Sequence, residues 1–169
     1  MAKGFHVALL RAVNLGPHGK VAMADLRAMA EALDLEHPKT LLNSGNLVFG
    51  DHRKPAALET LLEKEAAKRL GLDTDFIVRT ASEIRSIVKA NPFPQQAKND
   101  PGHLTVLFCK NAPGTSPKTS GAKREEFVVK GREVYINYPD GIGTSKFKID
   151  AYGTARNWNT LLKISGALA

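Results

Sequence analysis

Residues 39–49, Lys-Thr-Leu-Leu-Asn-Ser-Gly-Asn-Leu-Val-Phe, decide the fold of the first half of the chain. They contain two short predicted strands, 39–43 and 47–49, that are joined through Ser44, Gly45 and Asn46. Glycine and asparagine tolerate the positive φ that a tight turn demands, so this segment predicts a β-hairpin. An apolar strand over 5–11 precedes the hairpin, and a further strand over 75–79 follows it.

Two amphipathic helices are predicted, one before this hairpin and one after it. Apolar residues recur with helical spacing over 26–33 and again over 58–66. Gly71 follows the second of these stretches and is expected to end its helix. The first half therefore has the order β-α-β-β-α-β, which is typical of a ferredoxin-like unit.

The second half predicts α-β-β-β-α and partly echoes the first. Thr80 and Glu83 have capping-box spacing and open a short helix. A strand over 103–109 and a hairpin around Gly131 follow, and a last helix begins near Trp158. We expect an α+β protein of two ferredoxin-like halves, residues 1–80 and 81–169, packed together as one compact unit with mainly antiparallel sheets.

The strands over 5–11 and 103–109 are apolar on both faces. A sheet with one solvated face would alternate apolar and polar residues. We therefore expect the second face to be covered, either by the other half of the chain or by a second copy in a homodimer. The pattern also disfavours an open RNA-binding sheet, which would show stacking aromatic residues among basic ones.

The bulk composition is that of a soluble globular protein. The chain has 169 residues, of which 43% are hydrophobic and 24% are charged. No apolar run reaches the length of a membrane span, and the first residues lack the core of a signal peptide. Cys109 is the single cysteine and suits a reducing compartment. These features predict a cytoplasmic protein without a membrane partner.

The charge is positive and unevenly placed. The net charge is +7, with 14 basic and 12 acidic residues over 1–109, but 10 basic and 5 acidic residues over 110–169. A positive surface favours anionic partners such as nucleotides, phosphates or nucleic acid. The alternative is that this charge only maintains solubility.

The familiar signatures of metal and cofactor sites are missing. The five histidines are scattered and Cys109 has no second thiol, so no metal site is predicted. The glycine-containing loop 140–146 fits neither a P-loop nor a dinucleotide-binding fingerprint. We expect no cofactor.

Three polar clusters nevertheless interrupt otherwise apolar elements. In loop 140–146, the glycines let backbone N–H groups converge, while Ser145 and Lys146 would neutralise an oxyanion. In 154–160, Arg156 lies beside a predicted helix start, a good arrangement for a carboxylate or phosphate. At the N-terminus, Arg11 ends a buried strand and is followed by a glycine-containing loop.

Each cluster also has a purely structural interpretation. Loop 140–146 would be a tight turn before a solvated basic segment, and Arg11 would cap a sheet end. Arg156 would pair with Asp140, with Asp150 or with a backbone carbonyl. The ligand-binding interpretation takes in residues of all three clusters and of the hairpin turn: Arg11, Asn14, Lys20, Ser44, Asn46, Asp140, Ser145, Lys146, Arg156, Asn157 and Asn159.

Taken as a set, these motifs resemble an uncharacterised bacterial family, domain of unknown function 1697. The resemblance runs from about Phe5 to Ile164 and is most specific in the Ser-Gly-Asn hairpin and in Arg-Asn-Trp-Asn-Thr at 156–160. It also includes Asn-Pro-Phe at 91–93 and Tyr-Pro-Asp-Gly at 138–141. The resemblance implies a cytoplasmic α+β protein built from two ferredoxin-like halves, and it implies no particular reaction.

Three functions remain open from the sequence. The first is binding of an anionic ligand: a nucleotide, a phosphorylated metabolite or short nucleic acid. The second is a metal-independent enzyme, in which Lys146 or Arg156 stabilises negative charge and Asp140 or Ser145 handles a proton. The third is a structural or protein-interaction module without a ligand site. Burial separates the first two, because a desolvated Lys146 favours catalysis and an exposed one favours binding.

Overall fold

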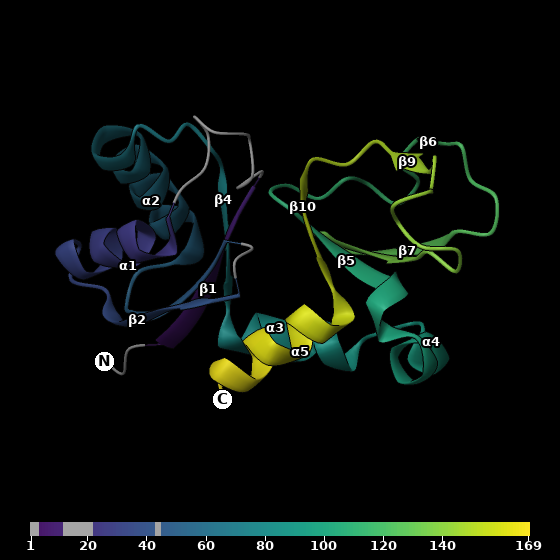
Figure 1. Cartoon of the computed structure of the whole chain (residues 1–169), viewed down its shortest axis with the longest axis horizontal. Coiled ribbons are helices and arrows are strands. Elements are labelled where there is room, and N and C mark those ends of the chain that lie inside the picture. Colours follow the sequence, from purple (N-terminus) through teal and green to yellow (C-terminus); the bar gives the residue numbers. More distant parts are fainter. Residues whose placement is uncertain (1–3, 12–21, 43–44) are drawn as a thin grey trace. The chain divides into compact units, whose positions relative to one another are not determined.

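The computed structural model describes residues 4–11, 22–42 and 45–169 and shows an α+β protein with antiparallel sheets (Figure 1). The chain divides into two compact units. The first unit contains residues 1–85 and 163–169, and the second contains residues 86–162. Within the described ranges, no helix combines the length and the apolar character needed to cross a membrane.

The first unit has the element order predicted for the first half. Its elements are β1 (Gly4–Leu10), α1 (Met23–Ala32), β2 (Glu36–Leu41), β3 (Asn46–Asp51), α2 (Pro55–Leu70) and β4 (Phe76–Thr80). The strands lie in the order β2-β3-β1-β4, and every neighbouring pair is antiparallel.

The predicted hairpin is confirmed as the β2–β3 pair. Gly45 has a φ of 73°, in the left-handed region that glycine adopts without strain. The buried Asn46 donates a hydrogen bond from Nδ2 to the carbonyl of Leu41 at 3.0 Å. This side chain therefore has a structural role in closing the hairpin.

Both faces of β1 are buried, as its apolar pattern predicts. Ala8 and Leu10 pack against α1 and α2, which cover one face of the sheet (Figure 1). Val7 and Leu9 alternate with them, point to the opposite face and are also buried.

The exposed edge of the first sheet is closed by carboxylates from α2. Glu63 accepts a hydrogen bond from the backbone N–H of Phe76, and Glu59 accepts one from Val78, each at 2.9 Å. These contacts satisfy donors on the outer edge of β4, which would otherwise present a template for pairing with another strand.

The second unit lacks the β-α-β-β-α-β order of a ferredoxin-like half. As in the predicted α-β-β-β-α order, its strands follow one another between helices, but there are six strands in place of three. Its sheet has the strand order β10-β5-β8-β7, with antiparallel pairs throughout, and a separate two-stranded ribbon joins β6 to β9. No helix lies between two strands of this unit, all of which is described. The polar connections over 110–118 and 139–147 lack the apolar stripe that a packed helix would need. The strands are β5 (Leu104–Cys109), β6 (Thr119–Ser120), β7 (Glu126–Lys130), β8 (Glu133–Asn137), β9 (Lys148–Ile149) and β10 (Gly153–Asn157).

The helices of this part of the chain include one that the sequence did not predict. The polar stretch 94–103 forms α4 (Pro94–Asn99) and a 3₁₀ turn (Pro101–His103). Each of these begins with a proline, whose fixed φ suits the first helical position. The division between the two units falls inside α3 (Ala81–Lys89) and inside α5 (Trp158–Ala167).

Phe147 fixes the long connection between β8 and β10 to the core of the second unit. Its ring packs 5.8 Å from that of Phe127 and 6.3 Å from that of Tyr138, measured between centroids. Cys109, which is buried, belongs to the same apolar cluster. Because Phe147 is anchored, the polar residues on either side of it have defined positions.

Candidate functional site

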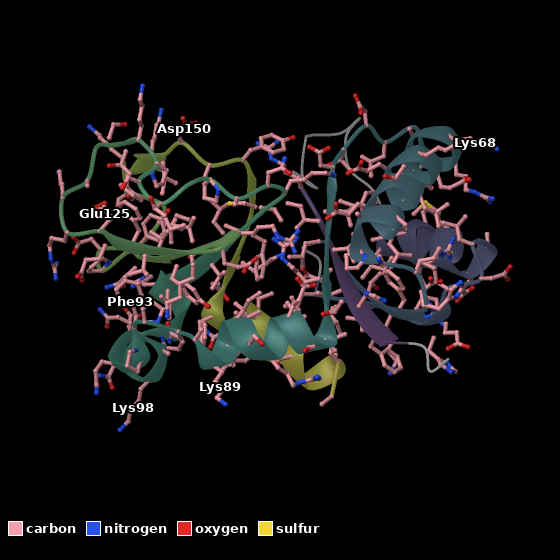
Figure 2. The ribbon with its side chains drawn as sticks, turned by 180° about the vertical axis from the view of Figure 1, so that it is seen from behind. Lys68, Lys89, Phe93, Lys98, Glu125 and Asp150 are labelled. Carbon is pink, nitrogen blue, oxygen red and sulfur yellow. The ribbon has the colours of Figure 1, made fainter. Side chains whose placement is uncertain are left out.

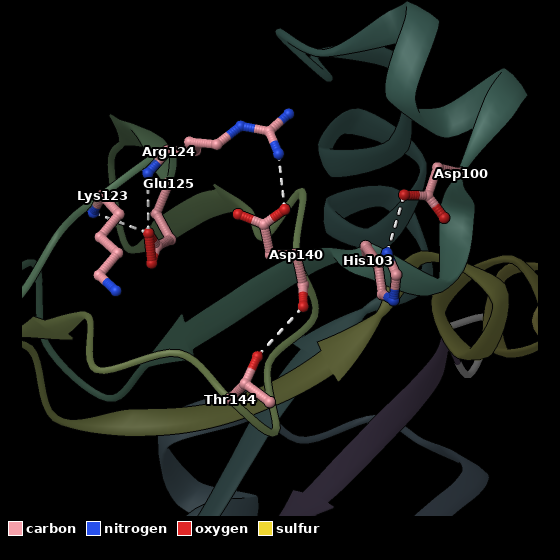
Figure 3. Close-up of polar contacts among 7 residues, drawn as sticks. All are labelled: Asp100, His103, Lys123, Arg124, Glu125, Asp140 and Thr144. Carbon is pink, nitrogen blue, oxygen red and sulfur yellow. Dashed lines mark hydrogen bonds and ion pairs between the residues drawn. The ribbon is translucent and has the colours of Figure 1, made fainter.

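A pocket of about 190 Å³ opens in the second unit, between the segment before β7 and the loop that follows β8. Figure 3 shows several of the side chains at this place. Lys123 and Glu125 line it from the first segment. From the second segment, the lining residues are Tyr138, Asp140, Gly141, Thr144, Ser145 and Lys146.

The two segments are held together by close backbone contact. A Cβ added at Gly121 would lie 2.1 Å from the carbonyl oxygen of Lys146, and the φ of Gly121 is +70°. Only glycine fits both conditions. Beyond this point β6 pairs with β9, and the N–H of Asp150 donates to the carbonyl of Lys118 at 2.8 Å. The pocket therefore rests on backbone that approaches from two distant parts of the sequence.

The carboxylate of Glu125 is engaged by the protein itself. It accepts hydrogen bonds from the backbone N–H groups of Lys123 at 2.9 Å and Arg124 at 3.1 Å. It also accepts one from the Ser145 hydroxyl at 2.8 Å. These donors lower the pKa of Glu125, the Lys123 N–H having the largest effect and the Ser145 hydroxyl the next.

Asp140 is also partnered. Its Oδ1 lies 2.6 Å from Nη1 of Arg124 in a solvent-exposed ion pair (Figure 3). Its backbone carbonyl accepts a hydrogen bond from Thr144 Oγ1 at 3.2 Å. Gly141, with a φ of +88°, completes the turn by donating its N–H to the carbonyl of Tyr138 at 2.9 Å. Asp140 therefore pairs with Arg124. Of the partners named for Arg156 in the structural interpretation, the backbone carbonyl is the one found, since Arg156 donates to the carbonyl of Ala155.

Two cations of the pocket have no partner among the described residues. The side chains of Lys123 and Lys146 are exposed, and neither ammonium group forms a hydrogen bond or ion pair there. With Arg124, the site has three cations against the two carboxylates of Glu125 and Asp140. The exposure of Lys146 favours binding over catalysis, by the criterion set out from the sequence.

An aspartate–histidine pair lies beside this pocket. His103 Nδ1 is 2.8 Å from Asp100 Oδ2 (Figure 3). The other ring nitrogen, Nε2, would be 3.6 Å from a Cβ at Gly141, so the ring abuts the pocket loop. The sequence interpretation passed over His103 as one of several scattered histidines. The spacing Asp-Pro-Gly-His was the available signal, because a 3₁₀ turn brings residues i and i+3 together.

The candidate residues of the 154–160 cluster lie in β10 and at the start of α5, away from the pocket. Arg156 lies within β10, is only 7% exposed, and donates from Nη1 to Thr154 Oγ1 at 2.7 Å and to the carbonyl of Ala155 at 2.9 Å. Burial lowers the pKa of Arg156 to about 10. Asn157 caps α5 by accepting the N–H of Thr160 at 2.9 Å, and Asn159 lies exposed on the first turn. None of these residues lines the pocket.

The N-terminal candidates belong to the first unit. Arg11 donates its N–H to the carbonyl of Asp75 at 3.1 Å, and its own carbonyl accepts a hydrogen bond from the Thr74 hydroxyl. Asn46 closes the hairpin, as described above. The other three candidates, Asn14, Lys20 and Ser44, lie outside the described residues.

The first unit also has a wide, open hollow of about 650 Å³ along the edge strand β2, lined by residues 37–41 with Arg27 and Glu31. Arg27 already pairs with Glu31 at 3.1 Å. No group of three or more His, Cys, Asp or Glu side chains suited to a metal ion occurs in the described part of the chain.

Comparison with known proteins identifies relatives but no activity. The family model described as "Protein of unknown function (DUF1697)" matches residues 4–135. The segments at 138–146 and 154–160, on which the resemblance partly rested, lie beyond that match. The fold is similar to that of the conserved bacterial protein SP0830 from Streptococcus pneumoniae, with a TM-score of 0.75 and 21% identity over 99% of this chain and 100% of that one. The comparison with curated proteins finds no match.

Proposed function

This chain belongs to the DUF1697 family of proteins of unknown function, and from that premise we propose that it binds an anionic ligand through a phosphate group. The ligand would be a nucleotide, a phosphorylated metabolite or a short nucleic acid. The binding site would be the pocket between the segment before β7 and the loop after β8.

One observation carries this proposal: both carboxylates of the pocket form hydrogen bonds or an ion pair within the protein, whereas the ammonium groups of its two lysines form none among the described residues. Glu125 is held by two backbone N–H groups and the Ser145 hydroxyl, and Asp140 is paired with Arg124. An incoming anion would meet the ammonium groups of Lys123 and Lys146, which are free to bond to it, at a site with one more cation than carboxylates. Charge-assisted hydrogen bonds of this kind are roughly twice as strong as neutral ones.

The size of the pocket limits what it would enclose. Sites that enclose a whole small molecule usually measure about 300–1,000 Å³. At about 190 Å³, this pocket suits a single phosphate group, with the rest of the ligand lying outside it. The proposed function is therefore recognition of one phosphate on a larger molecule.

Titration of the ¹⁵N-labelled protein with inorganic phosphate, followed by NMR, tests this function. We expect the amide resonances of Arg124, Gly141 and Ser145 to shift in a saturable way. The K123Q/K146Q variant should lose this response. The control is K68Q/K98Q, which removes the same charge from two exposed side chains that extend away from the ribbon in Figure 2. Equal loss in the control, or no saturable shift in the wild type, would contradict the proposal.

A second candidate function rests on Asp100 and His103. A carboxylate that orients a histidine is a common arrangement for proton transfer, and this pair abuts the loop of the phosphate pocket. The chain would then be a metal-independent enzyme. His103 would take a proton from the water that attacks phosphorus, the P–O bond to the ester oxygen would break, and the protonated His103 would return the proton to the leaving alcohol oxygen. Phosphate release from a panel of phosphomonoesters, lost in His103→Gln while phosphate binding persists, would favour it. This candidate comes second because Lys146 is exposed, and an exposed lysine favours ligand binding over catalysis.

The fold of the first unit supports a more specific description. We propose that it is a ferredoxin-like module, because it combines the β-α-β-β-α-β order with antiparallel pairing throughout. The proposal does not extend to the second unit, whose strands follow one another without an intervening helix.

Location and assembly remain proposals that direct measurement would test. A reducing, cytoplasmic location is supported by the lone, buried Cys109. Fractionation of cells expressing the tagged protein would test the location. Size-exclusion chromatography with light scattering would show whether the chain forms a homodimer, one of the two alternatives for covering the second sheet face.

A further inference from the structure

A second hollow lies on the same two segments as the phosphate pocket. It measures about 350 Å³ and is lined by residues 118–120 and 148–150. Lys118 and Lys148 contribute its two cations, and Thr119 and Ser120 contribute hydroxyl groups. The close contact between Gly121 and Lys146 lies between the two hollows in sequence: residues 118–120 and 148–150 are on one side of it, and the other residues that line the pocket are on the other.

Residues 146–152 alternate strictly between inward and outward side chains. Phe147, Ile149 and Ala151 pack on the apolar cluster of the second unit. The side chains between them are all exposed: Lys146, Lys148, Asp150 and Tyr152. The backbone is extended in β9 (Lys148–Ile149) and bends at Asp150, where the N–H of Ala151 donates to the carbonyl of Ile149 at 2.9 Å.

The partner strand adds to the same outward face. Ser120 is the cross-strand partner of Lys148, and Lys118 lies opposite Asp150, to whose N–H its carbonyl is bonded. Directly opposed residues in an antiparallel pair project from the same side. We call this face the basic strip: Lys118, Ser120, Lys146, Lys148, Asp150 and Tyr152.

An aromatic ring ends the basic strip. Tyr152 is 53% exposed, which is unusual for a large ring, and its backbone carbonyl is fixed by the N–H of Lys110 at 3.3 Å. The cations of the strip extend beyond the place of a single phosphate group, because Lys118 and Lys148 lie outside the pocket that Lys123 and Lys146 line.

We propose that the ligand is a single-stranded nucleic acid, with one phosphate in the pocket, its backbone along the basic strip and a base stacked on Tyr152. This inference rests on the proposed function. A row of lysines follows the backbone of a polyanion, and an exposed aromatic residue stacks on an unpaired base, which is the combination found in proteins that bind single strands. Paired bases in a duplex would not be available to Tyr152.

The test is fluorescence anisotropy of a labelled single-stranded oligonucleotide of mixed sequence, measured over a range of salt concentrations. In K118Q/K148Q, the slope of log K against log salt should fall by about 1.4, because each phosphate contact on a single strand contributes about 0.7. Its NMR response to inorganic phosphate should be unchanged, since neither lysine lines the pocket. K68Q/K98Q should keep the full slope.

The stacking contact is tested separately at Tyr152. Tyr152→Ala should weaken oligonucleotide binding by roughly 5- to 150-fold, the range for losing one base–aromatic stack. Tyr152→Phe keeps the ring and should retain the affinity. A duplex of the same sequence that binds as tightly as the single strand and is insensitive to Tyr152→Ala would overturn the inference.

The two proposals fail in different ways. If phosphate shifts the pocket resonances but the oligonucleotide binds no more tightly than phosphate, the nucleic-acid inference is wrong and the proposed function stands. If neither probe binds, both are wrong. An unchanged salt slope in K118Q/K148Q would also reject the basic strip as the path of the backbone.

Discussion

Replacing Gly121 by alanine tests whether the architecture of the site is as described. Two conditions at this position exclude a side chain: the φ of +70° and the carbonyl oxygen of Lys146 only 2.1 Å from where a Cβ would lie. The carbonyl carbon of the same residue would be 2.8 Å away. Both atoms belong to the backbone, so no side-chain rotation relieves the clash.

The size of the effect follows from these two conditions. A left-handed conformation costs a residue with a Cβ about 1–2 kcal/mol. The clash adds to this, because the two segments must separate and lose part of their contact. We therefore expect Gly121→Ala to lower the free energy of unfolding by at least about 3 kcal/mol, at the high end for a single substitution.

Two other glycines provide matched controls. Gly131 has a φ of +62° but nothing within 4 Å of an added Cβ, so Gly131→Ala should cost only about 1–2 kcal/mol. Gly143 has open space and no positive φ, so Gly143→Ala should stay within about 0.5 kcal/mol of the wild type or be slightly stabilising.

Urea unfolding followed by circular dichroism measures all three variants. The expected order of destabilisation is Gly121, then Gly131, then Gly143. Gly121→Ala should also lose the NMR response to phosphate, because the segments on either side of the pocket have moved. A Gly121→Ala variant as stable as Gly131→Ala would show that the close approach at Lys146 is absent and would refute the reasoning.

Three further predictions concern buried polar groups. The Arg53 guanidinium lowers the pKa of the buried Asp51 to about 2. The ionised Asp51 therefore stabilises the fold above pH ~4, and this stabilisation is lost as the pH falls toward ~2. In urea unfolding between pH ~5 and ~2, the wild type should lose about 2 kcal/mol more of its free energy of unfolding than Asp51→Asn. Arg156→Ala should cost about 2–4 kcal/mol in thermal or urea unfolding, because it removes a buried side chain together with its hydrogen bonds to Thr154 and Ala155. Phosphate binding measured by NMR on the folded variant should persist. Burial raises the pKa of Tyr135 to about 12, and its hydroxyl donates to the carbonyl of Ile87 at 2.5 Å; Tyr135→Phe should cost about 1–2 kcal/mol and remove the last step of an ultraviolet phenolate titration.

The parts of the fold that the sequence predicted are those set by short-range chemistry. Thr80 and Glu83 form the expected capping box, with reciprocal hydrogen bonds of 2.9 and 3.0 Å. Gly71 ends α2 with a φ of 62°, and Gly131 joins β7 to β8. Each of these signals involves residues within about four positions of one another. The local sequence therefore contains all the groups whose hydrogen bonds or backbone conformation form the cap or turn.

The site was less predictable because its contacts join distant residues. Ser145 was singled out, but its partner Glu125 lies 20 positions away, and Asp140 pairs with Arg124 across 16 positions. No local pattern indicates which carboxylate meets which cation. Arg156 was misplaced for a related reason: β10 ends directly at α5, so a residue near a helix start lies in a buried strand.

The second unit shows the same limit on a larger scale. Its longer strands were predicted, over 103–109 and in the hairpin around Gly131, but the β6–β9 ribbon consists of only two residues on each side. Such short strands carry no periodic signal. Their pairing depends on Gly121 and Phe147, whose contacts appear only in the folded chain.

The most direct test of the central claim is a crystal of this protein soaked in tungstate, an anion with the shape and charge of phosphate whose heavy atom is located by anomalous scattering. The account predicts a strong anomalous peak in the second unit, within hydrogen-bonding distance of Nζ of Lys123 and Lys146, and no such peak in crystals of K123Q/K146Q. A peak at another place with the pocket left empty, or an equal peak in the variant, would contradict it.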